Sequence, residues 1–548
     1  MSDSNVGGRK NKSGINHIWL VNTIIHEHVS SVKKVPVVIQ KFDYMQMFDG
    51  MDSSEACGDI FEYGVKDDHL QLIHEANKEV VISVKTPHGQ SEHYKLTGRN
   101  MQGDTWAPAM ASAQVDRFGK EMILEEPSYM FRFKGEVAIP LLGQVDDLLG
   151  IAEAGFKSEQ LNAFVNVKTA DKDLQFGSDK CSFMVVSKVK PEIVPKSELF
   201  VDKWNLIHTE DGQFHEEFIG KVPMKEENTF VYLGHVLSKD GSNMPNIIHK
   251  ENKSIGTQRT IVKLVEPLSV YTFESAVIYV ESLIRSSILY SSEAMIHIKE
   301  LEYRALEKIE ESVIQKVVGT TRSCSRHLLY LEFGMIPARF QVKRQVLNLL
   351  QYIVQQPESS LLFKVFKALE NNPVKNDWIS GARDCLDEFE IHMSFQEIKL
   401  MKTTQYKNIV KKQANKAAFR YLIQKQEGGK KGKFIKYDSI QMADYLLPEC
   451  SLSVFDKREM FAFRCEMNNL PDNFGKSEMC EQQCQTLMNN EHLLSCSHLN
   501  QGQSQQLEMN QIRNGNIVEK IEVLKKLQEN SERRLKLIEA QSIITQGI

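Results

Sequence analysis

The feature that most constrains this chain is a pair of adjacent aspartates set between two apolar runs. The runs are Val137–Leu142 and Leu148–Ile151, and the residues between them read Gly143-Gln-Val-Asp-Asp147. Short apolar runs on either side of a few polar residues predict a β-hairpin. We therefore expect a tight turn at which both carboxylates lie close together.

A third aspartate follows a separate apolar run. Val35–Ile39 predicts a buried strand that continues through Lys41 to Asp43, and Pro36 is tolerated because it stands at the strand's start. Asp52-Ser-Ser-Glu55 has the form of a helix capping box. Strands and amphipathic helices mixed in this way predict an α+β domain.

The three carboxylates suit metal-dependent phosphoryl chemistry. Nucleotidyl transfer uses two divalent cations about 4 Å apart, and Mg²⁺ takes oxygen ligands. Asp43, Asp146 and Asp147 could provide them. The alternative is that the aspartate pair is an ordinary surface turn.

Composition narrows the class of protein but does not identify it. The chain has 548 residues, of which 41% are apolar, so it can bury several cores, and its net charge of -5 gives no global sign of nucleic-acid binding. Nine cysteines, spread mostly singly, predict reduced thiols and an intracellular protein of the nucleus, the cytoplasm or both. A polar N-terminus and no apolar stretch of about 20 residues predict neither secretion nor a membrane partner.

Five short motifs occur in one order along the chain. They are Asp43-Tyr-Met-Gln-Met-Phe48-Asp49, Gln102-Gly103-Asp104 with Pro108, Gln144-Val-Asp-Asp147, Leu174-Gln-Phe-Gly-Ser-Asp-Lys180-Cys181, and Tyr232-Leu-Gly234 with Ser238-x-Asp-Gly241. This series resembles the palm motifs of reverse transcriptases from non-LTR (LINE-type) retrotransposons, although that family's third motif is usually aromatic-x-Asp-Asp. The resemblance implies a right-hand polymerase palm with an antiparallel sheet and flanking helices, followed by a mostly helical thumb.

The resemblance also implies an activity and a role for each motif residue. The activity is RNA-directed DNA polymerisation with two Mg²⁺ ions, in which Asp43 and Asp146 ligate both metals and Asp147 supports them. Phe48 would be the steric gate that excludes a ribose 2'-hydroxyl. The remaining implied roles are contact with the template and nucleotide by Gln102 and Gly103, proton donation to pyrophosphate by Lys180, and a primer grip at Tyr232, Leu233 and Gly234.

The implied partners are template RNA, primer or target DNA, and dNTPs. About forty residues precede Asp43, so against this family we expect an N-terminally truncated chain with the fingers missing or reduced to a stub and with no endonuclease. Two other functions stay open. One is a non-catalytic nucleic-acid-binding remnant, and the other is an RNA-directed RNA polymerase, in which a bulky aromatic at position 48 is not expected.

Two further stretches suggest binding. Cys480-x3-Cys484-x7-His492-x3-Cys496 has the ligand types of a zinc knuckle, with His498 or Cys465 as substitute ligands, or else it is a set of unpaired thiols. Residues 399–436 carry twelve Lys or Arg against one acid, Glu427, with Tyr406, Phe419 and Tyr421 interleaved. This composition is typical of contact with nucleic acid or of a solvated helix face.

The expected order of units follows from these patterns. Residues 1–190 would form the palm with a remnant of fingers, 191–255 the primer-grip end of the palm, 256–448 a helical thumb and extension, 449–505 the Cys/His region, and 506–548 a C-terminal helix or tail. Leu301, Leu306, Ile309, Val313 and Val317 recur at helical spacing in the third unit.

Overall fold

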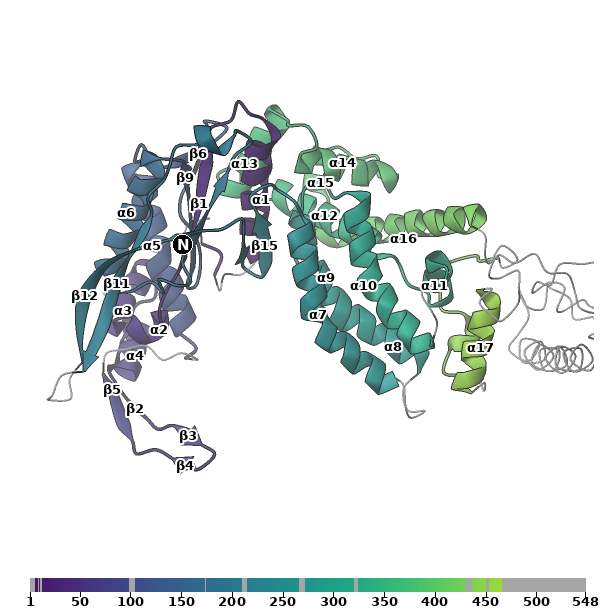
Figure 1. Cartoon of the computed structure of the whole chain (residues 1–548), viewed down its shortest axis with the longest axis horizontal. Helices are drawn as coiled ribbons and strands as arrows, with labels where there is room; N and C mark the ends of the chain where they lie inside the picture. The colour runs from purple at the N-terminus through teal and green to yellow at the C-terminus, as the bar shows by residue number, and fades with distance from the viewer. Residues whose placement is uncertain are drawn as a thin grey trace, which may run out of the picture.

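The computed structural model divides into a half built on a β-sheet and a helical half, with helix α1 (Gly14–Ser30) between them (Figure 1). It describes residues 5–7, 9, 12–97, 104–172, 174–208, 214–265, 272–319, 324–429, 436–449 and 453–465. The sheet half confirms the predicted α+β class. In the described residues, no helix is long and apolar enough to cross a membrane.

The main sheet has five strands with β1 at its centre. Its order is β13 (Lys225–Glu226), β10 (Ser182–Val186), β1 (Val37–Asp43), β9 (Asp147–Glu153) and β8 (Leu142–Gln144). The β10–β1, β1–β9 and β9–β8 pairs are antiparallel, and β10–β13 is parallel. The two strands that carry the predicted aspartates are thus direct neighbours.

The two faces of this sheet belong to different cores because successive side chains of a strand point to opposite faces. Val38, Phe42 and Leu148 pack with helices α5 (Ala107–Glu125) and α6 (Phe156–Ala170). Ile39, Leu149 and Ile151 belong to a core that includes α1 and continues through the helical half. A single apolar core therefore joins the α1 face of the sheet to the helices.

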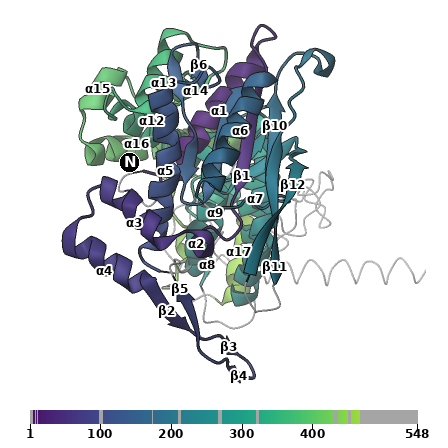
Figure 2. The same ribbon diagram turned by 90° about the vertical axis from the view of Figure 1, so that its left-hand side faces the viewer.

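Two projections leave the sheet half (Figure 2). The first consists of α2 (Met47–Gly50), α3 (Ser53–Glu62), α4 (Asp67–Lys78), the pair β2 (Glu79–Ile82) with β5 (Tyr94–Thr97), and the pair β3 (Lys85–Thr86) with β4 (Gly89–Gln90). Asp52 caps α3 by accepting from the backbone N–H groups of Ser54 and Glu55, as its sequence predicts. The second is a long hairpin, β11 (Phe200–His208) with β12 (Phe214–Pro223), which follows the short helix η1 (Pro191–Ile193). This hairpin was not predicted from the sequence.

The helical half begins earlier than the pattern suggested. Helix α7 (Met244–Val265) contains the boundary expected between residues 255 and 256. The other helices in the described residues are α8 (Phe273–Tyr279), η2 (Val280–Arg285), α9 (Ser286–Leu289), η3 (Ser292–Ala294), α10 (Glu300–Val318), α11 (Arg326–Glu332), α12 (Ala338–Val354), α13 (Leu361–Asn371), α14 (Trp378–Glu388), α15 (Phe395–Leu400), α16 (Thr403–Gly428), η4 (Asp444–Leu446) and α17 (Val454–Arg464). Helix α10 buries four of its five predicted positions, whereas Leu301 is exposed.

One strand prediction needs correction. The run Val137–Leu142 does not form one arm of the aspartate hairpin. Val137–Ile139 is β7, which pairs with β6 (Phe131–Phe133), and Pro140 separates it from β8. Proline has no N–H to donate to a strand ladder, which accounts for the break.

Candidate polymerase-type carboxylate site

Asp43 and Asp147 face each other across two central strands. In the antiparallel register of β1 and β9 they are direct partners at the end of the ladder. Direct partners have side chains on the same face, with Cβ atoms about 4.5–5.5 Å apart. Lys41 shares this face because it lies two residues before Asp43. The predicted meeting of Asp43 with the hairpin is confirmed.

Asp146 lies in the two-residue turn that joins β8 to β9. Gln144 and Asp147 are paired, which leaves only Val145 and Asp146 as the loop. Val145 has a φ of 58°, a left-handed conformation that a β-branched residue rarely adopts and that costs about 1–3 kcal/mol. The turn is tight, as predicted, but Asp147 belongs to the strand rather than to the turn.

Residues 5–7 hold this turn from outside the sheet. Val6 donates its N–H to the carbonyl of Gly143 at 3.1 Å, and Asn5 donates from its side chain to the carbonyl of Ser112 at 2.7 Å. A Cβ on Gly7 would lie 2.7 Å from the backbone nitrogen of Val145 and 2.6 Å from the Ser112 hydroxyl. Glycine is therefore required where this segment crosses the turn.

Two lysines are the cations closest to Asp43. The Nζ of Lys180 lies 3.6 Å from one carboxylate oxygen, and the Nζ of Lys41 lies 3.9 Å from the other. Lys180 reaches Asp43 because Gly177, in the same loop, donates its N–H to the Asp43 carbonyl at 2.9 Å. Lys180 was identified from the sequence and lies beside Asp43, and its role as a proton donor to pyrophosphate stays a prediction. Lys41 was missed, although its same-face spacing from Asp43 was a usable signal.

The carboxylates repel one another. The pKa of Asp147 is raised to about 6, chiefly by burial and then by the charges of Asp146 and Asp43, while Lys41 acts in the opposite direction. Like charges held close together disfavour ionisation of the more buried member. The site therefore holds negative charge that its own lysines only partly balance.

These oxygens fit a hard divalent cation by their chemistry, and a bound cation would relieve the repulsion that raises the Asp147 pKa. Across the described ranges, however, no three His, Cys, Asp or Glu side chains are grouped so as to hold a metal ion. The ligand types are present, but their side chains are not arranged as a coordination shell.

The predicted primer-grip residues lie beside this hairpin. Strands β14 (Thr229–Tyr232) and β15 (His235–Ser238) are joined by Leu233 and Gly234, both with positive φ. A Cβ on Gly14 would lie 2.6 Å from the side-chain oxygen of Gln144 and 3.0 Å from Leu233. The tip of this second hairpin and the base of the aspartate turn thus meet at Gly14.

Tyr232 lies under the carboxylates. It is 1% exposed, and its pKa is raised by burial and by the charge of Asp147. Its hydroxyl lies 3.2 Å from Nδ1 of His17, whose pKa burial lowers to about 3, so His17 is neutral. No local sequence signal could have paired His17 with Tyr232, because 215 residues separate them.

The positions of the other predicted residues do not test their predicted roles. Phe48 in α2 is partly buried against the core on the α5 and α6 face, so its gate role stays a prediction. Pro108 lies in the first turn of α5, after the second motif. Gln102, Gly103, Cys480, Cys484, His492 and Cys496 lie outside the described residues. Cys465, the substitute zinc ligand, is buried at the end of α17, and its thiol forms a hydrogen bond with Cys324.

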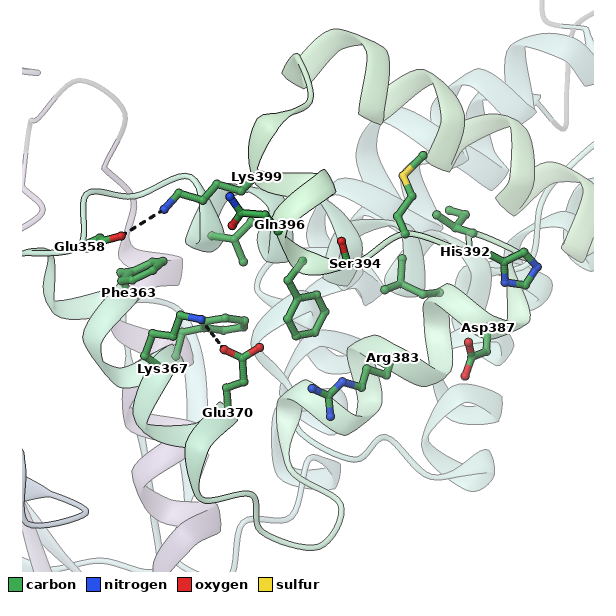
Figure 3. A pocket seen from close by; sticks show the side chains of 16 residues that line it. Glu358, Phe363, Lys367, Glu370, Arg383, Asp387, His392, Ser394, Gln396 and Lys399 are labelled. Carbon is green, nitrogen blue, oxygen red and sulfur yellow. Dashed lines mark hydrogen bonds and ion pairs between the residues drawn. The ribbon is translucent and has the colours of Figure 1, made fainter.

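A cavity elsewhere in the chain is unrelated to these residues. It has a volume of about 630 Å³ and lies among α13, α14 and α15 (Figure 3). The Lys399 ammonium lies 5.0 Å from the Phe363 ring centre, and the Arg383 guanidinium lies 5.2 Å from that of Phe395. None of the predicted site residues lines it.

The comparisons with known proteins find a resemblance only among solved structures. No protein-family model matches the chain, and no curated protein matches it. Telomerase from Candida albicans in complex with a TWJ fragment of telomeric RNA is 13% identical, with a TM-score of 0.27, over 70% of this chain and 51% of that one.

Two structures from Candida tropicalis give similar values. Telomerase with the TWJ fragment is 12% identical with a TM-score of 0.30, over 72% of this chain and 52% of that one. Apo telomerase is 12% identical with a TM-score of 0.26, over 69% and 57%. The chain thus spans slightly more than half the length of these structures. TM-scores this low do not establish a common fold, and the function proposed below is not drawn from them.

Proposed function

We propose that this chain is an RNA-directed DNA polymerase of the retrotransposon type, which adds dNTPs to a primer 3'-hydroxyl by two-metal nucleotidyl transfer. The observation that carries the proposal is the β1–β9 register, in which Asp43 and Asp147 are direct partners with Asp146 beside them in the turn. Carboxylates from two neighbouring strands are what a pair of Mg²⁺ ions needs as a platform. The order of the five sequence motifs supports the same class.

Asp43, Asp146 and Asp147 are the residues that would hold Mg²⁺, whose chemistry when bound is to activate the primer hydroxyl and neutralise the triphosphate. Phe48 would pack against the sugar of the incoming nucleotide. Leu233 and Gly234 would hold the primer end, since their turn meets the base of the aspartate hairpin at Gly14. Lys180 keeps Asp43 partly neutralised until substrate arrives.

The test is primer extension on an RNA template with dNTPs and Mg²⁺. We expect extension by the parent chain, and background levels with Asp146→Asn or Asp147→Asn. Asp68→Asn is a matched control, because Asp68 is exposed in the first turn of α4 and belongs to none of the five motifs. Equal extension by all four proteins, or by none, would refute the proposal.

A second function is favoured by one observation. The described carboxylates are not grouped as a metal site, and two lysines lie against Asp43. A palm that keeps its fold without metal would serve as a non-catalytic nucleic-acid-binding protein. Binding of template RNA without any extension would select this alternative.

The zinc knuckle is proposed from sequence alone. Zinc content measured by atomic absorption should be close to one ion per chain and should fall with Cys484→Ser. Content near zero in both proteins would remove the knuckle.

A further inference from the structure

A polar groove lies where α1, α9, α12 and α16 approach one another. Its volume is about 590 Å³, and residues of all four helices line it. Ile15, Leu289 and Ile336 form its apolar part, and the rest of the lining is charged or carries hydroxyl or amide groups. It lies apart from the carboxylates, and no sequence motif pointed to it.

The groove is lined by three cations, Arg285, Arg344 and Lys411, against two acids, Glu281 and Glu293. Arg344 is half-buried, and its pKa is lowered by burial and by neighbouring Arg285, although Glu281 opposes this shift. Among the described residues no carboxylate lies within ion-pair distance of it. Arg285 itself is paired with Glu281 and Glu310. Lys411 is exposed on the opposite wall, next to Asn415. A half-buried, unpaired guanidinium is costly unless a ligand supplies the missing anion.

The groove reaches the primer-grip turn through Tyr290. This residue lines the groove, and its hydroxyl donates to the carbonyl of Leu233 at 3.0 Å. Its ring would lie 3.5 Å from a Cβ on Gly234. Tyr290 therefore belongs both to the groove and to the surroundings of the primer-grip turn.

The positive charge continues along α16. Lys407, Lys411, Lys412 and Lys416 are exposed on this helix. They form two like-charged pairs at i,i+4, which weaken a helix unless a polyanion binds them. No large apolar side chain is exposed on α16, so insertion into a lipid surface is not favoured.

We propose that this groove and the adjoining face of α16 bind the phosphodiester backbone of a nucleic-acid strand as it leaves the carboxylate site, with Arg344 and Lys411 on opposite sides of one phosphate. Such contacts position a strand without reading its sequence. The proposal rests on the proposed function for the direction of the strand. The binding itself needs no catalysis.

The test is equilibrium binding of the full chain to fluorescein-labelled RNA–DNA duplex, DNA duplex and single-stranded RNA, across a range of salt concentrations. With Arg344→Gln and Lys411→Gln together, we expect at least about a tenfold loss of affinity near 0.1 M salt. We also expect the slope of log K against log salt to fall by about two. The three nucleic acids show which backbone the groove accepts.

The charge-matched control is Lys308→Gln with Lys364→Gln, two exposed lysines of α10 and α13 that do not line the groove. If the variant with Arg344→Gln does not fold, Lys411→Glu alone tests the same groove, because Lys411 is exposed and its substitution is not expected to prevent folding. Equal binding by the groove variant and the control overturns the proposal, as does failure of the parent chain to bind any of the three.

Asp147→Asn separates this proposal from the polymerase proposal. If it binds as the parent does while extension is absent from both, only the polymerase proposal fails. If the parent extends primers and the groove variant binds like its control, only the groove proposal fails.

Discussion

The carboxylate end of the sheet and the interior of the helical half treat buried charge in opposite ways. In the helical half, Arg464 is paired with Glu332 at 2.8 Å and Arg285 with Glu310 at 3.0 Å, all with side chains at most 6% exposed. At the end of the sheet, two lysines lie 3.6 and 3.9 Å from Asp43, while Asp146 and Asp147 lie beside it on the neighbouring strand and turn. Balanced charge stabilises architecture, whereas charge left unbalanced marks where a ligand is required.

The substitution expected to have the largest effect on stability is Arg464→Met. Removing one partner of a buried pair leaves an uncompensated charge and is expected to cost about 3–5 kcal/mol. Glu332 would keep only its hydrogen bonds from Tyr437 and Tyr445. Scanning calorimetry should show the melting transition of the protein at a clearly lower temperature.

Arg420→Met is the control for that change. Its pair with Glu390 is exposed, at 48% and 56%, so a loss below about 1 kcal/mol is expected. Equal destabilisation by the two variants would show that burial does not distinguish these pairs.

Asp147→Asn should stabilise the protein at neutral pH, whereas Arg464→Met should destabilise it. The folded pKa of about 6 lies above the unfolded value of about 3.9, so ionisation of Asp147 opposes folding as the pH rises from about 4 to 6. The variant should gain about 1–2 kcal/mol at pH 7, after allowing for partial exposure, and much less at pH 4, which lies close to the unfolded pKa. Urea unfolding at the two pH values measures this.

Asp240→Asn should change stability in the opposite direction to Asp147→Asn. Although burial raises the pKa of Asp240, hydrogen bonds from Ser238 and Ser242 outweigh it and lower the pKa. Its contribution to stability is present at neutral pH and is lost as the pH falls, so the substitution should destabilise the protein at pH 7. If both variants shift stability in the same direction, the contrast between the two regions is wrong.

A small gain in stability is expected for Val145→Gly. Glycine adopts the φ of 58° at this position without strain, and a gain of about 1 kcal/mol in the free energy of unfolding is expected. The added freedom should slow primer extension, because Asp146 follows Val145 directly. A gain in stability with undiminished extension would show that the strained turn does not position the carboxylate.

Local signals predicted the parts of the site that lie within one strand or turn. The strand ending at Asp43, the cap at Asp52 and the tight turn at Asp146 all follow from spacing over a few residues. The groove at Arg344 and the contact of His17 with Tyr232 depend on segments far apart in the chain, and no short-range pattern encodes them. Pro140 lies between these two cases. Its lack of an N–H can be seen in the sequence, but the break between β7 and β8 was not predicted from it.

The apolar core that crosses from the sheet into the helices has a consequence for how the protein can be divided. Trp19 of α1 meets Trp378 of α14 at 5.6 Å between ring centres, and α1 also contacts α13 and η3. Cutting the chain before α7 would strip α1 of these partners and expose Trp19 to water. The sheet half is therefore not an autonomous folding unit, and a transfer of strands β1 and β9 into another scaffold would have to include the helices that pack on them.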